Sequence, residues 1–219
     1  MFQNDILRVA IEEAVLRGVS VETVLMLLLF PVTAALVAFS RHVIGFSGFG
    51  IFVPILVTIA FVYSGVLAGF LLFLVIILTA SFGRVVVRRL KLPYLPRMAV
   101  LLWLLALGAL LLLLVAPILG MEGLVKMTIF PILFFMMLTE ENIEAQITRT
   151  WQAAVLMTVE TLFIAILGSA IIGNGWVRGW FLTNPTFASL AVLGVDMLIG
   201  KYKGLRLMEV WRFRKLIKS

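Results

Sequence analysis

The chain has 219 residues, of which 63% are hydrophobic and only 13% charged, and its formal net charge is +7. Soluble domains average roughly 45–50% apolar and about 25% charged residues. A soluble core of this size cannot hide so many apolar side chains, because small domains bury only part of the surface of their unfolded chain. The composition therefore predicts an integral membrane protein in contact with the lipid bilayer.

Cysteine and histidine usage excludes several kinds of chemistry. The chain has no cysteine and one histidine, His42. Disulfides, thiolate metal sites and multi-histidine metal sites are therefore excluded, and we expect no cofactor and no enzymatic active site. The excess of basic residues favours a topology signal and attraction to anionic lipids. We expect no nucleic-acid partner, since no soluble domain is left to bind one.

The apolar segments predict an all-α fold with about seven transmembrane helices. A helix needs about 20 apolar residues to cross the bilayer, and period-two alternation is not seen. Residues 1–19 form an amphipathic interfacial segment, residues 20–200 the transmembrane domain, and residues 201–219 a basic juxtamembrane helix. The seven predicted spans are Val21–Phe39, Gly50–Val62, Val66–Gly83, Met98–Met121, Leu124–Leu138, Ile147–Ile172 and Phe181–Ile199.

The basic residues predict an orientation. If the seven spans alternate, every one of the 18 basic residues lies on the side of the C-terminus except Arg8, Arg17, Lys126 and Arg178. Cytoplasmic loops carry an excess of Lys and Arg. We therefore expect a multi-pass protein of the bacterial inner membrane, with the N-terminus outside and the C-terminus in the cytoplasm.

Two acidic residues within predicted spans are candidate functional residues. Glu160 lies near the middle of the sixth span, where a charged carboxylate costs at least about 2.5–3.5 kcal/mol. It is either a proton or cation site or a protonated residue that joins helices through hydrogen bonds. No basic residue is expected at its depth, so its expected partners are neutral: Thr58, Thr79, Ser81 or Thr158. Asp196 is expected to pair with Lys201 or Lys203 at the cytoplasmic interface.

A glycine-rich segment links the first two spans and is the second candidate site. Gly45, Gly48 and Gly50 precede Pro54. A nucleotide-binding loop would need a preceding strand and a basic residue in register, and the sequence indicates neither here. Such glycines either allow close packing in a tight turn or break a helix beside a polar cavity. Arg41 and His42 directly precede the segment, so an anionic group could meet both side chains there.

The predicted cytoplasmic face offers a surface for lipid or protein. Its basic residues attract anionic lipid, and aromatic and Arg side chains are enriched at protein interfaces. The candidate residues are Arg84, Arg88, Arg89, Lys91, Arg97, Arg206, Trp211, Arg212, Phe213 and Arg214.

Several ordered runs of residues carry a family resemblance. They are Arg41–Gly45 with Phe49–Leu56, Leu90–Leu92 with Pro96–Arg97, Leu138–Glu141, Thr158–Leu162, and Gly200–Glu209 with Arg212–Arg214. In this order they resemble a bacterial family of seven transmembrane helices usually fused to an inactive transglutaminase-like domain. That domain precedes the spans in the family and is not part of this sequence. The glycine- and proline-containing early spans are also similar to the small membrane subunit of poly-γ-glutamate capsule synthesis.

Three functions remain open from the sequence. The resemblance implies a non-enzymatic membrane subunit that assists a cytoplasmic ATP-grasp-type peptide or glutamate ligase at the cell envelope. Glu160 and the Gly45–Pro54 region would instead suit a small transporter or channel. A lipid-interacting scaffold is the third hypothesis. A homo-oligomer is compatible with each of them.

Overall fold

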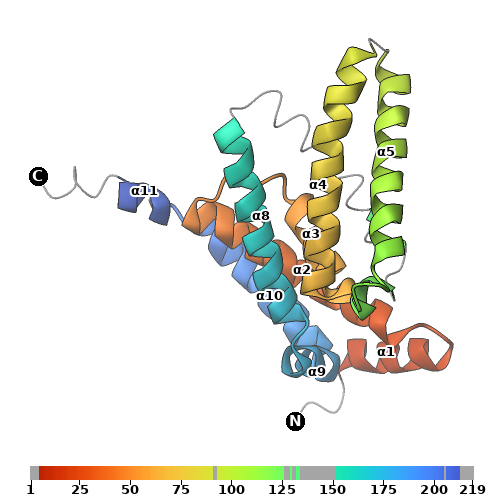
Figure 1. The fold of residues 1–219 in the computed structure, drawn as a ribbon. Coiled ribbons are helices and arrows are strands. Elements are labelled where there is room, and N and C mark those ends of the chain that lie inside the picture. The colour runs from red at the N-terminus through yellow and green to blue at the C-terminus, as the bar shows by residue number, and fades with distance from the viewer. Residues whose placement is uncertain are drawn as a thin grey trace, which may run out of the picture.

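The computed structural model describes residues 5–90, 93–125, 129, 132–133, 151–204 and 206–212. All regular structure within these ranges is helical, which confirms the predicted all-α fold class (Figure 1). The α-helices are α1 (Ile6–Leu16), α2 (Val21–Phe39), α3 (Phe52–Ser64), α4 (Val66–Arg89), α5 (Tyr94–Val115), α6 (Glu122–Val125), α8 (Trp151–Ile172), α9 (Gly175–Thr183), α10 (Pro185–Lys201) and α11 (Leu207–Arg212).

Four described stretches are long and apolar enough to cross a membrane, namely Val21–Ile44, Val66–Val87, Tyr94–Val115 and Val155–Ile172. The bent pair α9 and α10 adds a fifth if it counts as one span, and α3 is a shorter apolar helix. The predicted span Leu124–Leu138 lies mostly outside the described residues. The chain is thus a membrane protein with helices in contact with lipid.

The predicted last span, Phe181–Ile199, contains a helix break that was not predicted. Phe181 belongs to α9, and α10 begins only at Pro185, after a bend of 110° between the two helices. Proline has no backbone N–H and keeps the residue before it out of the helical region. Asn184 accordingly has φ −131° and ψ 59°, so the helix ends there and restarts at the proline.

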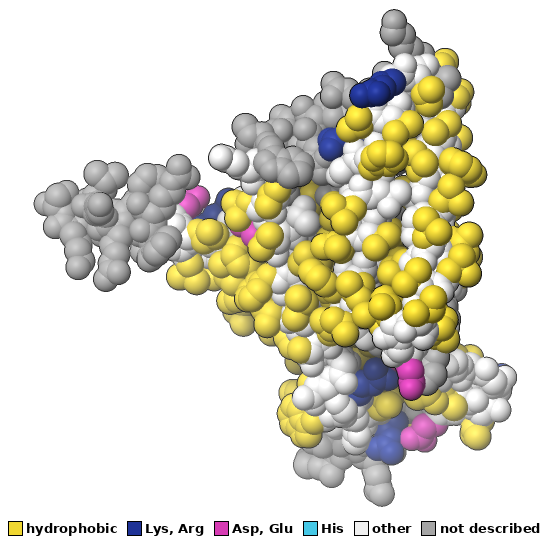
Figure 2. All heavy atoms as spheres, viewed as in Figure 1, with side chains coloured by type: hydrophobic (Ala, Val, Ile, Leu, Met, Phe, Trp, Pro, Cys, Tyr) yellow, Lys and Arg dark blue, Asp and Glu magenta, His cyan; other side chains and the backbone are white. Residues whose placement is uncertain are grey.

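Helix packing divides the molecule into two connected parts (Figure 1). α4 and α5 form a long antiparallel hairpin, while α3 packs along α8 and α2 packs along α10. The largest buried cluster joins the two parts; it contains Val53 and Val57 of α3, Leu72 of α4 and Leu105 of α5. On the face shown in Figure 2, apolar side chains cover most of the described surface between the charged ends.

The helix α1 lies across one end of the molecule beside α9 and the start of α10 (Figure 1). Its N-cap residue, Asp5, accepts hydrogen bonds from the hydroxyl and the backbone N–H of Thr186. These bonds, led by the one from the hydroxyl, hold the pKa of Asp5 below its usual value. Arg178 of α9 also pairs with Glu22 of α2 at 2.5 Å. Polar contacts therefore fasten the first segment to this end.

Candidate functional site

The glycine-rich segment begins at a widened helical turn. Residues Ser40–Ile44 continue α2 as a turn of π-helix, η1, and the Ser40 carbonyl accepts hydrogen bonds from the N–H groups of Gly45 and Phe46 at 3.0 and 3.1 Å. Gly45 then adopts φ +99°, a left-handed conformation that favours glycine. Single π-turns occur often at functional sites. Here the turn directs the chain away from α2 into the loop of residues 45–51.

Polar groups of α8 hold this loop. The N–H of Ser47 donates to Oε2 of Glu160 at 2.6 Å, and the N–H of Phe49 donates to Oγ1 of Thr161 at 3.2 Å. Glu160 is only 6% exposed. A buried carboxylate that accepts a backbone N–H satisfies both groups, since each would otherwise be costly to bury. Glu160 and Thr161 thus fix the loop against the middle of α8.

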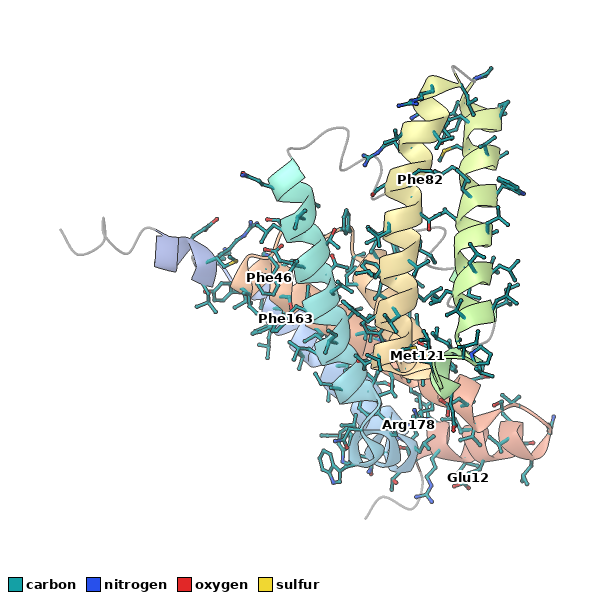
Figure 3. The ribbon with its side chains drawn as sticks, in the orientation of Figure 1. Glu12, Phe46, Phe82, Met121, Phe163 and Arg178 are labelled. Atoms are coloured by element: carbon teal, nitrogen blue, oxygen red, sulfur yellow. The ribbon has the colours of Figure 1, made fainter. Side chains whose placement is uncertain are left out.

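Aromatic packing and an arginine also hold the loop of residues 45–51. We call this loop, together with Glu160 and Thr161, the loop clamp. The ring of Phe46 meets the ring of Phe163 edge to face, with centroids 6.1 Å apart (Figure 3). Gly48 is buried, and a Cβ atom there would lie 3.0 Å from Oγ1 of Thr161. The Arg41 guanidinium donates to the carbonyls of Gly48 and Phe49. Arg41 is therefore bound to the loop that it precedes.

The structure gives Glu160 a partner that was not predicted, the backbone N–H of Ser47. Arg41 binds the carbonyls of Gly48 and Phe49 in the same loop. Thr58, one of the expected partners, donates instead to the Pro54 carbonyl of its own helix at 2.7 Å. The reason is that the loop folds back from the end of η1 onto α8, which brings the N–H of Ser47 to the acid.

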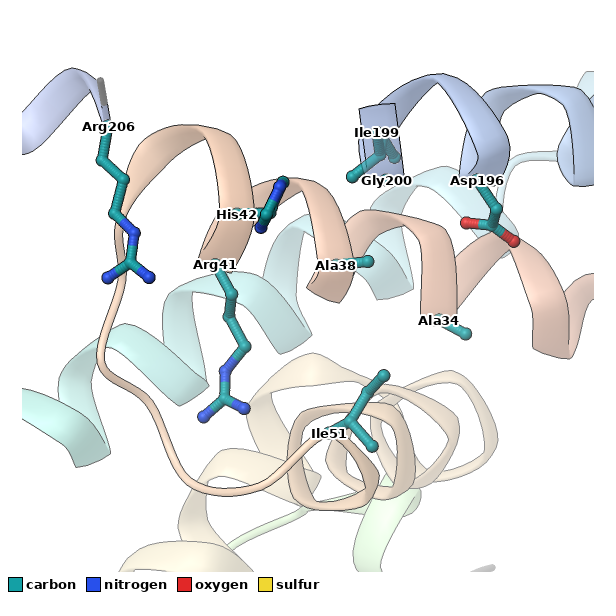
Figure 4. Close-up of a pocket in the computed structure, with 9 residues that line it drawn as sticks. All are labelled: Ala34, Ala38, Arg41, His42, Ile51, Asp196, Ile199, Gly200 and Arg206. Carbon is teal, nitrogen blue, oxygen red and sulfur yellow. The ribbon is translucent and has the colours of Figure 1, made fainter. Parts of the chain in front are cut away.

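A cavity of about 530 Å³ opens on the other side of the π-turn. Figure 4 shows its lining, which comes from α2, η1, the loop, α10 and the segment after α10. The lining residues are Ala34, Ala38, Arg41, His42, Ile51, Asp196, Ile199, Gly200 and Arg206. Its size is in the range of small-molecule sites.

Contacts from the chain after α10 shape this cavity. Nε2 of His42 donates to the Tyr202 carbonyl at 3.0 Å, and the two rings meet edge to face. The side chain of Arg206 covers Gly45, so that a Cβ on Gly45 would lie 3.1 Å from Cβ of Arg206. The π-turn and the chain after α10 are thereby joined, with Arg206 placed over the start of the loop.

The prediction for Asp196 is also wrong. In the described ranges no ion pair joins Asp196 to Lys201 or Lys203; the carboxylate lines the cavity instead. Lys201 follows Asp196 by five residues, so the two side chains are not helical neighbours three or four apart. Figure 4 places Asp196 at the end of the cavity away from Arg41 and Arg206.

The structure thus sorts the predicted site residues into two neighbouring groups. Glu160 and Gly48 belong to the loop clamp, whereas His42, Asp196 and Arg206 line the cavity, and Arg41 takes part in both. Gly45 lies against the side chain of Arg206. Gly50 is exposed between loop and α3, and Pro54 is buried in α3. The prediction missed Thr161, although its hydroxyl directly follows Glu160 in the sequence.

Basic residues at the two ends of the molecule differ in their pairing. At the end with α1 and α9, Arg8, Arg17 and Arg178 each pair with a glutamate. At the opposite ends of the helices, five basic residues have no acidic partner in the part of the chain that is described: Arg89, Arg97, Lys201, Lys203 and Arg206. Arg84 lies there too, near the end of α4. Lys91, Phe213 and Arg214 lie outside the described residues, as do the side chains of Arg88, Trp211 and Arg212.

Comparison with known proteins gives one match. Residues 3–217 match a family described as 7 transmembrane helices usually fused to an inactive transglutaminase. No curated protein and no solved structure matches the chain.

Proposed function

Because this chain belongs to the family of seven transmembrane helices usually fused to an inactive transglutaminase, we propose that it is a non-enzymatic, multi-pass subunit of the bacterial inner membrane. In this proposal its basic face lies in the cytoplasm and binds a cytoplasmic ATP-grasp-type peptide or glutamate ligase. The ligase and the likeness to the capsule-synthesis subunit come from the sequence resemblance.

The observation that carries the proposal is the unequal pairing of basic residues at the two ends. The three arginines near α1 and α9 are neutralised by glutamates, whereas Arg89, Arg97, Lys201, Lys203 and Arg206 have no acidic partner among the described residues. An excess of Lys and Arg in the connecting segments favours the cytoplasmic side, whether or not these residues are paired. Basic residues without an acidic partner among the described residues can in addition attract an acidic protein surface.

The transport hypothesis has less support. A transport site in Glu160 needs a carboxylate that exchanges its ligand, but Oε2 of Glu160 already accepts the N–H of Ser47. Arg41 in turn binds two carbonyls of the same loop. Glu160 is thus a structural partner of the loop in this conformation.

Reporter fusions test the orientation. A reporter that is active only in the cytoplasm is expected to work when fused after Ser219 and to fail when fused after Gly120, in the turn that follows α5. The reason is the excess of basic residues at the C-terminal side. A reporter that works only in the periplasm should give the reverse pattern. Periplasmic activity after Ser219 would overturn the proposed orientation.

Affinity purification from the native host tests the partner. We expect an ATP-grasp ligase to co-purify with the wild-type chain. Combined Arg89→Glu and Lys203→Glu substitutions should reduce its recovery at least about tenfold, since like charges across an interface cost several kcal/mol. The matched control combines Arg8→Glu and Arg17→Glu on the opposite face and should leave recovery unchanged. Equal recovery from both double variants would contradict the proposed docking face.

A charge-preserving variant separates docking from lipid attraction. Combined Trp211→Ala and Phe213→Ala substitutions keep every basic residue but remove two aromatic groups of the kind enriched at interfaces. We expect lower recovery of the ligase with unchanged membrane insertion, because the preceding helices already secure insertion. Unchanged recovery would favour the lipid-scaffold hypothesis for the tail.

A further inference from the structure

The cavity between α2, η1 and α10 combines a cationic end with an apolar wall. Its cationic end is formed by the guanidinium groups of Arg41 and Arg206, with the His42 ring beside them. Figure 4 shows the two guanidinium groups extending to the same side, inside the curve of the loop. Nη2 of Arg41 already donates to the Gly48 and Phe49 carbonyls, so an anion in the cavity would meet the other N–H groups of this guanidinium together with those of Arg206. Arginine is the side chain best suited to phosphate oxygens, which it binds with two parallel hydrogen bonds.

The remaining lining indicates what is attached to the anion. Ala34 and Ala38 of α2 face Ile199 and Gly200 of α10 across the cavity. These small and apolar groups leave room beside the cationic end without offering hydrogen bonds. α2 belongs to a stretch that is long and apolar enough to cross the membrane, the surroundings in which an alkyl chain is favourable. A ligand with a phosphate at one end and an alkyl chain at the other matches both parts.

Asp196 sets the direction in which such a ligand enters. Its carboxylate is the acidic group of the cavity lining and lies at the far end from the guanidinium groups. It repels a phosphate from that end and leaves the arginine end favourable. The polarity of the cavity therefore fixes one orientation.

We propose that this cavity binds the phosphate group of an anionic membrane phospholipid between Arg41 and Arg206, with the acyl part along Ala34, Ala38 and Ile199. His42 acts as a positioning residue, because its hydrogen bond to the Tyr202 carbonyl ties down the segment that leads to Arg206. Gly45 keeps the Arg206 side chain in place by having no side chain of its own. The site does not depend on the ligase partner.

Binding of defined lipids to the full chain tests the proposal. The delipidated protein in detergent is titrated with dioleoyl phosphatidylglycerol and followed by native mass spectrometry. We expect Arg206→Gln to weaken binding at least about tenfold, because a charge-assisted bidentate contact is lost. The matched control Arg89→Gln removes an exposed, unpaired charge from the same end and should change binding less than about twofold. Equal weakening by both variants would show attraction by charge alone and overturn the site.

Two further ligands identify the source of the phosphate, and a second variant keeps the test informative if Arg206→Gln does not fold. Phosphatidylcholine, whose phosphate charge is balanced by choline, should bind less tightly, and inorganic phosphate at millimolar concentration should compete weakly. If inorganic phosphate competes fully and phosphatidylglycerol has no advantage, the ligand is a soluble phosphate and the lipid assignment is wrong. Asp196→Asn removes the repulsion and should tighten phosphatidylglycerol binding by about twofold or more. The effect of Asp196→Asn on lipid binding can be measured even if the Arg206→Gln variant fails to fold. If Asp196→Asn does not tighten binding, the proposed orientation is contradicted.

Discussion

Replacing Glu160 by alanine is expected to lower the free energy of unfolding by about 3 kcal/mol, because a buried hydrogen bond to a charged group is lost. The change leaves the N–H of Ser47 without the acceptor it has at 2.6 Å. Thermal unfolding in detergent, followed by circular dichroism, measures the effect.

Two matched variants divide this effect into its parts. Glu160→Gln keeps an oxygen that accepts from Ser47 and is expected to cost about half as much as alanine. Thr161→Val removes the hydroxyl that accepts from Phe49 and should cost about 1 kcal/mol. A glutamine variant as unstable as the alanine variant would show that charge, not the hydrogen bond, holds the loop. A glutamine variant that melts normally but no longer recovers the ligase would favour a proton or cation role.

Gly45→Ala is expected to cost about 1–2 kcal/mol of stability and to disturb the cavity. An alanine at φ +99° is strained, and its Cβ would lie 3.1 Å from Cβ of Arg206. The matched control is Gly18→Ala, since Gly18 has φ +102° but no atom within 4 Å of an added Cβ. Both variants should lose similar stability in thermal unfolding, whereas only Gly45→Ala should weaken phosphatidylglycerol binding. Equal lipid binding by both would show that Gly45 does not position Arg206.

The order of the helices follows from local sequence. The bounds of α2 agree with the predicted Val21–Phe39, and α4 begins at Val66 as predicted. Such bounds are readable because a helix satisfies its own backbone hydrogen bonds, so a long apolar run in lipid has one stable conformation. The bend at Asn184 and Pro185 is also determined by neighbouring residues in the sequence, but a count of apolar residues does not detect it. The proline at that position was the signal that marks the break.

The partners of the polar residues required the tertiary structure. Ser47 and Glu160 are 113 positions apart, and no periodicity relates them. The sequence marked Glu160, Arg41 and the glycines as unusual, since charge and backbone freedom are costly inside a membrane. It did not indicate that Arg41 reaches the carbonyls of the loop, or that Asp196 lines a cavity instead of pairing with a lysine.

Composition and hydropathy by themselves determined that this protein is an all-α membrane protein, because the free energy of transfer into lipid adds up residue by residue along each helix. The loop clamp of Glu160 and Thr161 and the cavity shared by Arg41 and Arg206 were decided only by how the helices pack. A hydrogen bond or a charge pair depends on the distance between two side chains. That distance is set by the fold of the π-turn and by the path of the chain after α10, both of which bring together residues far apart in the sequence.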